Sequence, residues 1–344
     1  MTSPESPAAV EAPALAPVRS PADGAEPSSR PVPIADRPSP GDHVFKWALT
    51  GAALAIPTLL LFLLYELSTG SRLAIDKFGL HFLVDSIWDP VAEKFGAYPL
   101  IFGTLLSSFL ALLIAVPLSL GVAIYLTEFA PRALRQPVAF VIELLAAIPS
   151  VVYGLWGVFV LMPVLKKVVF PLLRDALGFL PFFSGPIYGP SMLSASIILS
   201  IMVMPFIMAV SREVLLAVPG NQREAALALG ATRWEAVWTT ILPYARSGIM
   251  GAVVLGLGRA LGETMAVTML IGNRHEIAAS LFAPGYTMAA VIANEFSEAA
   301  TDMHFSALTY VALTLFVVTV LVNAGARLLI WRVARGSGVG SKAL

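Results

Sequence analysis

The sequence contains no cysteine and little charge for its length. None of its 344 residues is Cys, and Asp, Glu, Lys and Arg together make up 13%, about half of the ~25% found in soluble domains. Disulfides, thiolate chemistry and cysteine-ligated metals are therefore excluded. The formal net charge is zero, which gives no electrostatic basis for binding nucleic acid. No metal site is expected, because ligand-like spacing is missing among the four histidines, His43, His81, His275 and His304.

Apolar residues, in contrast, make up 57% of the chain and occur in long blocks. Such blocks are the signature of a chain that uses a lipid bilayer as its solvent. Each block has the roughly 20 residues that a helix needs to cross the hydrocarbon, and a helix satisfies every backbone polar group within one segment. The prediction is an all-α integral membrane protein with six transmembrane helices, at Trp47–Tyr65, Pro99–Tyr125, Pro137–Leu161, Met192–Val210, Ser247–Ile271 and Phe305–Leu329.

The two ends of the chain differ from this transmembrane domain, which is predicted to cover residues 45–335. Residues 1–44 carry 10 of the 26 prolines and few large apolar side chains. They cannot bury enough surface to offset the entropy of ordering, so they are predicted to be disordered. Residues 336–344 are rich in Gly but lack the G-x-x-x-x-G-K-[ST] spacing of a phosphate-binding loop. They are predicted to form a flexible tail.

The distribution of basic residues predicts the orientation in the membrane. Six spans place both termini on one side, and cytoplasmic segments carry an excess of Lys and Arg. Basic residues gather in the carboxy-terminal flank, after the second span and in the link at 211–246: Arg327, Arg332, Arg335 and Lys342; Arg132 and Arg135; Arg212, Arg223, Arg233 and Arg246. Against this bias, Lys166, Lys167 and Arg174 would lie outside. Both termini are therefore predicted to be cytoplasmic, in a multi-pass protein of the cell membrane.

The link between the fourth and fifth spans, residues 211–246, predicts two short helices joined by a sharp turn. In the first, Asn221 is placed to cap the amino terminus, with Glu224 at the third helical position bonding back. Gly230 suits the left-handed conformation that ends a helix. This helix is short, Ala-rich and weakly apolar on one face, which suits a segment that lies in another protein's groove. A plainer interpretation is that Glu224 and Gly230 are only a cap and a stop.

The second helix of this link is predicted to begin at Thr232. The hydroxyl of Thr232 can cap the helix, and Glu235 stands three residues later, as in a capping box. The helix is expected to end near Pro243.

The predicted fifth span contains two ionisable residues, Arg259 and Glu263. Arg259 lies about 18 Å along the helix from Ser247, near mid-membrane, where a charge costs roughly 2.5–3.5 kcal/mol and usually faces the bundle interior or water. Glu263 is one turn further on the same face and can pair with it. In one interpretation the two neutralise each other and fix helix packing. In the other, Arg259 is a transient partner for an anionic substrate, whose oxygens a guanidinium matches, and Glu263 prevents binding that is too tight.

Three further residues belong to this prediction. Gly258 and Gly262 form a G-x-x-x-G step, which predicts the close approach of a neighbouring helix. Glu143 in the predicted third span supplies another carboxylate for a translocation path. It stands six residues from the cytoplasmic end of that span and can snorkel to the interface, so it is the weaker candidate.

Four stretches of the sequence match the patterns of a known family. Glu224-Ala225-Ala226, Gly230 and Leu242-Pro243 resemble the EAA loop of ABC-importer permeases, although Thr240 stands where that family often has Ile. Three more stretches carry a closer match: Ala147–Leu155, Gly258–Ala266 and Ile292–Phe296. Together they resemble the PstC type of phosphate permease, within the MetI-like permease superfamily. The resemblance covers roughly residues 45–335.

This resemblance implies a role and a set of partners. The EAA loop implies a coupling helix that docks into a cytoplasmic ATPase, with Glu224, Ala225, Ala226, Gly230 and Pro243 as its marker residues. Because nucleotide hydrolysis then resides in that partner, the chain is a transport subunit and not an enzyme. The family implies a second permease of the PstA type, two ATPase copies of the PstB type and an extracytoplasmic phosphate-binding protein of the PstS type. It also implies that Arg259 and Glu263 serve phosphate passage by alternating access.

Other functions stay open on the sequence. A MetI-like permease for another oxyanion, such as sulfate or molybdate, would share the EAA loop. An ion-coupled secondary transporter could use Glu143 and Glu263 as a proton relay, but such transporters often contain internal repeats, which are not found here, and have no use for a coupling helix. An intramembrane enzyme would need a nucleophile–base or metal constellation, which the sequence lacks. On the predicted outer side, Glu295, Glu298 and Asp302 are candidate contacts for the binding protein.

Overall fold

A computed structural model describes residues 40–335 of the chain. The predicted tails, at 1–39 and at 336–344, lie outside the described residues. The chain divides into two units, Met1–Thr58 and Leu59–Leu344, and the boundary falls inside the first helix, α1 (Pro40–Gly70). Because α1 begins at Pro40, residues 40–44 are helical and do not belong to the predicted disordered tail.

Helices dominate the described residues, and six of them are long and apolar enough to cross a membrane. The predicted all-α membrane fold with six spans is thereby confirmed. The first, second, fourth and sixth helices contain the ranges predicted from the sequence, whereas the third and fifth differ. The six candidate spans are Gly41–Gly70, Tyr98–Phe129, Ser150–Leu177, Met192–Leu216, Arg233–Leu261 and Asp302–Arg332.

Three of these spans are built from consecutive helical segments. In the second span, α3 (Tyr98–Ile124) continues into a π-helical turn, η3 (Tyr125–Phe129). The fourth span is α8 (Met192–Leu216) and the sixth lies in α14 (Asp302–Arg335). The third span consists of five segments: α5 (Ser150–Trp156), η4 (Gly157–Leu161), α6 (Met162–Val164), η5 (Leu165–Val169) and α7 (Phe170–Leu177). The fifth span consists of α10 (Arg233–Ala236), η7 (Val237–Ile241) and α11 (Leu242–Leu261).

The predicted third span, Pro137–Leu161, is wrong because it joins two separate helices. α4 (Arg132–Ala147) ends before Ile148 and Pro149, whose backbones are extended with ψ of 131° and 140°. Proline disfavours helix at the residue before it, so a new helix starts at Ser150. Apolar residues continue on both sides of the break, so the composition of the sequence does not reveal it. The spanning helix then runs to Leu177, so Lys166, Lys167 and Arg174 lie within the third candidate span.

The predicted fifth span, Ser247–Ile271, is also two helices. α11 ends at Leu261, Gly262 follows as its carboxy-terminal cap, and α12 (Met265–Ile271) begins after Thr264. In the other direction the helix extends back beyond Ser247 through Pro243 to Arg233. Pro243 lies inside this continuous helix, directly after the π-helical turn η7, and donates no backbone hydrogen bond to the preceding turn.

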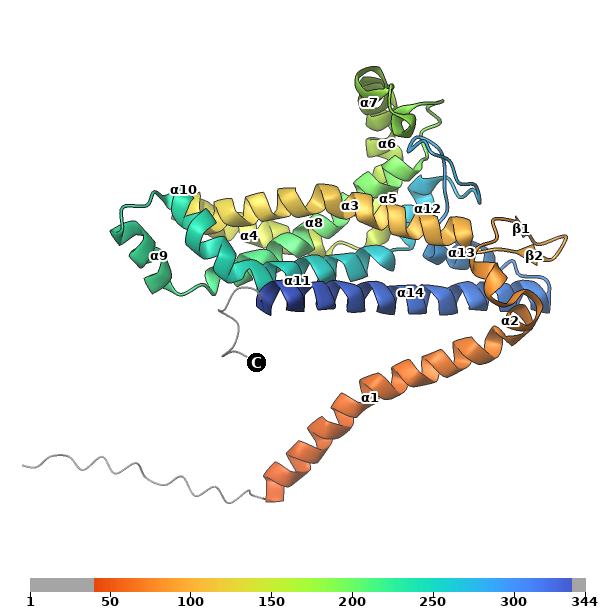
Figure 1. The fold of residues 1–344 in the computed structure, drawn as a ribbon, viewed down its shortest axis with the longest axis horizontal. Coiled ribbons are helices and arrows are strands. Elements are labelled where there is room, and N and C mark those ends of the chain that lie inside the picture. Colours follow the sequence, from red (N-terminus) through yellow and green to blue (C-terminus); the bar gives the residue numbers. More distant parts are fainter. Residues whose placement is uncertain (1–39, 336–344) are drawn as a thin grey trace, which may run out of the picture. The chain divides into compact units, whose positions relative to one another are not determined.

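The centre of the second unit is the pair α3 and α8, which share the most extensive contact in the chain (Figure 1). Small residues on both helices let them lie close together, and Ser119 Oγ donates a hydrogen bond to the carbonyl of Met204 at 3.0 Å. Large apolar side chains around them are fully buried, among them Ile198, Leu199 and Met202 of α8.

Close helix approach in α11 occurs at glycines other than those predicted. A Cβ at Gly256 would collide with Ile207 of α8, and one at Gly248 would collide with Val214. In contrast, a Cβ at Gly258 would lie at ordinary contact distance from Asn323 of α14, and a Cβ at Gly262 would meet no other segment of the described chain. The tight packing expected at Gly258 and Gly262 is therefore not made within the chain.

Short elements fill one end of the second unit (Figure 1). β1 (Trp88–Asp89) and β2 (Lys94–Phe95) form an antiparallel hairpin in which Trp88 pairs with Phe95. The ring of Phe82 stacks on Tyr310 of α14 with centroids 4.3 Å apart. The other short elements here are α2 (Arg72–Phe78), η2 (Gly79–Leu83) and α13 (Met288–Glu295), whereas η6 (Pro181–Phe183) packs against α7. The opposite end carries α9 (Gly220–Ala228).

Candidate functional site

The turn after α9 has the geometry that the sequence predicts. Gly230 adopts a φ of +88°. Its N–H bonds to the carbonyl of Leu227 at 3.0 Å, and the N–H of Ala231 bonds to that of Ala226 at 3.2 Å. This pair of bonds is the Schellman motif, which satisfies the last carbonyls of a helix. The start of the helix differs from the prediction: Pro219 precedes it without a side-chain cap and Asn221 lies inside it, so Asn221 and Glu224 form no capping box.

The second helix of the link is capped by Thr232, as predicted. The Thr232 hydroxyl accepts from the N–H of Glu235, and a carboxylate oxygen of Glu235 accepts from the N–H of Thr232 at 2.7 Å. The expected stop near Pro243 is wrong, because η7 and α11 continue the same helix into the fifth span. The turn is thus directly continuous with a candidate spanning helix.

The helix α9 lies at the surface of the second unit. None of its residues is buried, and Glu224 and Ala225 are exposed while Ala226 is partly exposed. Leu229, just past its end, is 90% exposed. A helix without a buried face cannot be held by an apolar core, so its shape suits a partner's groove.

Arg259 lies near the end of α11 on an exposed surface. Its guanidinium sits 5.8 Å from the centre of the Phe206 ring of α8, a cation–π contact. Tyr153 of α5 lies near enough for Arg259 to act on it electrostatically. The hydroxyl of Tyr153 donates to the carbonyl of Leu145 at 2.8 Å, which ties α5 to α4 across the break at Pro149.

Glu263 does not continue the face of Arg259. It lies in the break between α11 and α12, where its Oε1 accepts from the N–H of Ala266 at 3.2 Å. Within the described residues no ion pair joins Glu263 to Arg259, so the predicted pairing one turn apart is wrong. The physical reason is the end of the helix at Leu261, which turns the next residues out of register.

The helices that follow the two breaks, α5 and α12, pack against each other. Gly154 of α5 packs against α12, where a Cβ would meet the Met269 sulfur at 2.6 Å and the Cα of Ala266 at 3.2 Å. The stretches Ala147–Leu155 and Gly258–Ala266, distant in sequence, are therefore neighbours in space. Glu143 is placed apart from this arrangement: it is exposed on α4 and belongs to no candidate span.

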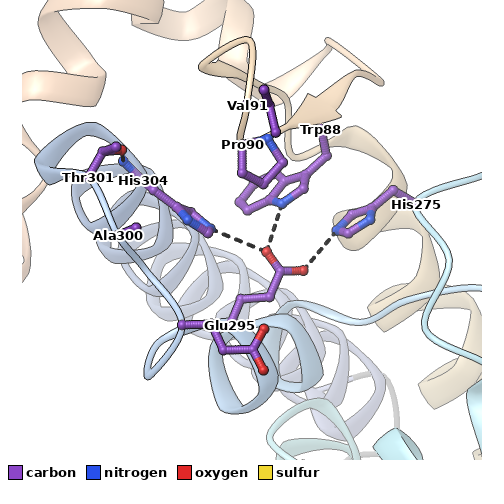
Figure 2. A pocket seen from close by; sticks show the side chains of 9 residues that line it. Trp88, Pro90, Val91, His275, Glu295, Ala300, Thr301 and His304 are labelled. Atoms are coloured by element: carbon purple, nitrogen blue, oxygen red, sulfur yellow. Dashed lines mark hydrogen bonds and ion pairs between the residues drawn. The ribbon is translucent and has the colours of Figure 1, made fainter.

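At the other end of the unit, Glu295 is surrounded by nitrogen atoms from three segments (Figure 2). Its Oε2 accepts from Trp88 Nε1 at 2.9 Å and lies 3.3 Å from His304 Nε2. Its Oε1 lies 3.6 Å from His275 Nε2. The side chain is only 17% exposed, so the carboxylate is used to join the hairpin, the segment before α13 and α14.

This cluster forms one wall of a cavity of about 480 Å³. Exposed Glu298 also lines the cavity, and Asp302 is exposed in the first turn of α14. Glu295 was singled out in the sequence, whereas Trp88, His275 and His304 were not. Their wide separation in sequence gives no spacing signal, and only the fold brings them together.

Burial shifts the pKa of two side chains here, His275 and Tyr286. Burial lowers the pKa of His275 to about 4, so its imidazole is neutral at neutral pH. The ring stacks on Trp88, with centroids 5.3 Å apart and planes 6° from parallel. Burial also raises the pKa of Tyr286 to about 12. The Tyr286 hydroxyl accepts a hydrogen bond from Asn294 Nδ2 at 2.9 Å.

One contact of the link was not foreseen from the sequence. Arg223 Nη2 of α9 lies 3.1 Å from Glu128 Oε1 of η3, in an ion pair whose side chains are 26% and 14% exposed. The sequence indicated Arg223 only as part of a basic segment. No local pattern predicts a partner in a helix so far away along the chain.

These features fit the class of protein that a family comparison identifies. The profile of the family described as "Binding-protein-dependent transport system inner membrane component" matches residues 115–335. The match contains both helix breaks, the link with α9 and the sixth span. The fold and this match together define a transport permease of the inner membrane.

Comparison with curated relatives narrows the class. The phosphate transport system permease protein PstC of Mesorhizobium japonicum is 46% identical over 301 residues, covering 86% of this chain and 92% of the relative. PstC of Xylella fastidiosa (strain 9a5c) is 47% identical over 306 residues, covering 88% and 94%. The chain belongs to the PstC family of phosphate transport system permeases. Among solved structures, a bacterial alginate ABC transporter matches with a TM-score of 0.55 at 20% identity, over 83% of this chain and 94% of that chain; this likeness concerns the fold.

Proposed function

We propose that the chain is the permease subunit of an ATP-driven importer of inorganic phosphate. The family supports this role, since relatives at 46–47% identity are named as phosphate transport permeases. In this proposal the chain pairs with a second permease of the PstA type, binds an ATPase pair of the PstB type and receives phosphate from a binding protein of the PstS type. Both termini lie in the cytoplasm, and nucleotide hydrolysis belongs to the ATPase partner.

The observation that carries the proposal is Arg259 beside the break after α11. Irregular backbone and an ionisable side chain are costly in lipid and are tolerated where they are buried in protein or line a water-filled path. Arg259 is exposed in the single chain, so the guanidinium is available at a surface that a second permease would cover. A guanidinium stays charged and matches phosphate oxygens in pairs.

The surroundings of Arg259 favour passage over tight binding. Its contact in this chain is the face of Phe206 and not a carboxylate, so the charge is held in place without being neutralised. Glu263 is held in the break by Ala266 and adds a negative charge to that region. A fixed cation attracts phosphate, and a nearby carboxylate opposes its retention.

The link at α9 supplies the connection to ATP. Glu224, Ala225 and Ala226 lie on a helix without a buried face, and the turn at Gly230 leads into α10 and directly into the fifth span. Docking of α9 into the ATPase groove would move the helix that carries Arg259. Closure and separation of the two ATPase copies would then alternate the access of phosphate to the two sides.

Phosphate uptake by a reconstituted assembly tests this function. We expect proteoliposomes with the four kinds of subunit to accumulate labelled phosphate in an ATP-dependent manner, and Arg259→Gln to reduce the rate by about tenfold to a hundredfold, as for loss of a charged hydrogen-bonding partner. Arg174→Gln, the same change at an exposed arginine of α7, serves as the matched control.

Each outcome of this experiment has a definite meaning. Full uptake by the Arg259→Gln assembly would show that Arg259 does not serve the translocation path, and the assignment as a permease would stand. Uptake of sulfate or molybdate in place of phosphate by the parent assembly would contradict the proposed substrate. Uptake that persists without ATP but follows an ion gradient would contradict the importer class.

A further inference from the structure

The helix α9 packs against η7 and α10, and its polar side-chain contacts with α8 and η3 come from one residue, Arg223. Its Nη2 donates to the carbonyl of Leu215, at the end of α8, at 2.7 Å. The same guanidinium forms the ion pair with Glu128 at 3.1 Å. In residues 40–335, both the side-chain hydrogen bond and the ion pair that join α9 to other elements are made by Arg223. One arginine thus connects α9 to the ends of two spanning helices.

The ion pair is shielded from water to a degree that gives it strength. The side chain of Glu128 is 14% exposed and that of Arg223 is 26% exposed. Charges in such a position are screened less than those of a surface pair. Removing one partner leaves the other charge with little solvent to compensate it, which is strongly unfavourable. The pair is therefore a partly buried electrostatic contact and not a solvent-exposed surface pair.

A cavity of about 310 Å³ borders this pair. It is lined by Arg135 of α4 and Arg233 of α10, as well as by Glu128 and Arg223. Glu128 is the carboxylate among these lining residues, and Arg135 donates through Nε to the carbonyl of Ala130 at 2.9 Å. The surplus of positive charge attracts the Glu128 side chain to this junction.

Glu128 stands at one end of a helix that reaches the opposite side of the unit. α3 runs from η3 to Tyr98, and near that end Gly103 leaves no room for a Cβ against the carbonyl of Tyr286. Thr104 Oγ1 accepts from the N–H of Met288, the first residue of α13, at 2.9 Å. α13 ends at Glu295 in the cluster with Trp88 and the two histidines. α3 is thus in direct contact with both ends of the permease.

We propose that the Arg223–Glu128 ion pair is the positioning contact through which movement of α9 is passed to α3. The inference rests on the proposed function, because it assigns a path to the coupling that the ATPase drives. Coupling between distant sites requires continuous physical contact between elements that move as units. Without the pair, α9 would act on α3 only indirectly, through η7 and α11, which packs against α3. With it, displacement of α9 pulls on α3 and, through Leu215, on α8.

The number of phosphate ions transported per ATP hydrolysed tests the proposal in proteoliposomes that hold the full assembly. Arg223→Gln and Glu128→Gln are each expected to lower this ratio by about tenfold, within the usual range of coupling between sites, while the ATPase stays bound and active. Exchanging the charges, with Arg223→Glu and Glu128→Arg together, is expected to restore part of the ratio, because Arg135 and Arg233 oppose an arginine at position 128 and the bond to Leu215 is lost. A general packing defect would not be repaired by such an exchange.

Two further variants keep the test decisive. Arg212→Gln removes an ion pair of 2.7 Å between neighbours in α8; since that pair connects no separate elements, the ratio should not change. Arg223→Lys keeps the positive charge and should retain most of the coupling even if the Gln variants assemble poorly. A ratio unchanged by Arg223→Gln would overturn the proposal. So would a charge exchange that restores nothing, or a loss with Arg223→Lys as large as with Arg223→Gln.

Failure of the proposed substrate can be told apart from failure of the ion pair. If the parent assembly transports no phosphate, the substrate assignment is contradicted. The pair is then judged by ATP hydrolysis stimulated by the binding protein, measured on the same variants. The single Gln variants should lose this stimulation and the charge exchange should recover part of it, and an equal response in all of them would overturn the proposal.

Discussion

His275 combines burial with an unsatisfied ring nitrogen. The side chain is 22% exposed, it stacks on Trp88, and its ring edge meets Tyr286 at a centroid distance of 4.7 Å. Among the described residues Nε2 has no hydrogen-bond partner, and it faces Glu295 Oε1 at 3.6 Å. The ring is therefore held by aromatic contacts as a neutral group. Protonation would place a charge in a site with little water, which the neighbouring carboxylate offsets only in part.

Acidification should therefore destabilise the protein through His275. The pKa is about 4 in the folded chain and 6.5 for an unperturbed imidazole, so between these values the unfolded chain binds more protons and stability falls as pH falls. The full difference corresponds to at most about 3 kcal/mol, and the carboxylate of Glu295 reduces it. We expect the melting temperature of the purified assembly to drop more between pH 7 and pH 5 for the parent than for His275→Phe, which keeps the ring.

A matched variant separates this effect from general acid sensitivity. His81 is exposed, so His81→Gln should leave the pH dependence as in the parent. An equal drop for His275→Phe and the parent would mean that this imidazole is not what responds to acid.

Residue identities in the sequence were informative where the chemistry is local, and uninformative where it depends on the fold. The capping box of Thr232 and Glu235 and the left-handed Gly230 follow from residues within one turn. The cost of a charge in lipid singled out Arg259. In contrast, Glu128 and Arg223, or Glu295 and Trp88, meet only because distant helices pack side by side, and helical periodicity contains no information about such partners.

At the scale of elements, the helix breaks at Pro149 and at Glu263 are more important for the fold of the permease than the lengths of its helices are. Six spans could be predicted because the bilayer fixes a minimum apolar length. The ends of the third and fifth could not, because α4 and α12 are apolar enough to extend the neighbouring runs. Glu263 provides the physical reason for the second break, since its carboxylate satisfies the N–H of Ala266 that helix would otherwise use.

The turn between α9 and α10 should depend on glycine at position 230. With φ at +88° and open space around the Cα, Gly230→Ala adds strain in the backbone alone, about 1–2 kcal/mol. The orientation of α9 should become less well defined, so we expect the ATPase to bind the permease about tenfold more weakly. Affinity of detergent-solubilised permease for the ATPase gives the measurement.

Gly220 offers the control for this substitution. It is the first residue of α9, also has open space around it, and does not adopt a positive φ. Gly220→Ala should bind the ATPase as well as the parent. Equal weakening by both alanines would attribute the loss to the added methyl group and not to the turn.

On the scale of the whole molecule, the second unit places α9 and the β1–β2 hairpin at opposite ends of the helical bundle (Figure 1). Large apolar side chains along the spans are exposed, such as Phe109, Phe159 and Leu321. In a bilayer these surfaces would meet lipid or the second permease. The basic residues gather toward the α9 end and the flank after the sixth span, which predicts that this end is cytoplasmic.

The absence of cysteine makes this orientation directly measurable. Val91 in the hairpin is 96% exposed and Leu229 beside α9 is 90% exposed, so Val91→Cys and Leu229→Cys each introduce one accessible thiol without disturbing the core. In intact cells, a membrane-impermeant maleimide should label Val91→Cys and not Leu229→Cys, and both should react after permeabilisation. The reverse pattern would mean that the protein has the opposite orientation in the membrane and that α9 lies out of reach of a cytoplasmic ATPase. Labelling of both in intact cells would mean that the helices between them do not separate the two compartments, which the apolar length of α3 and α8 argues against.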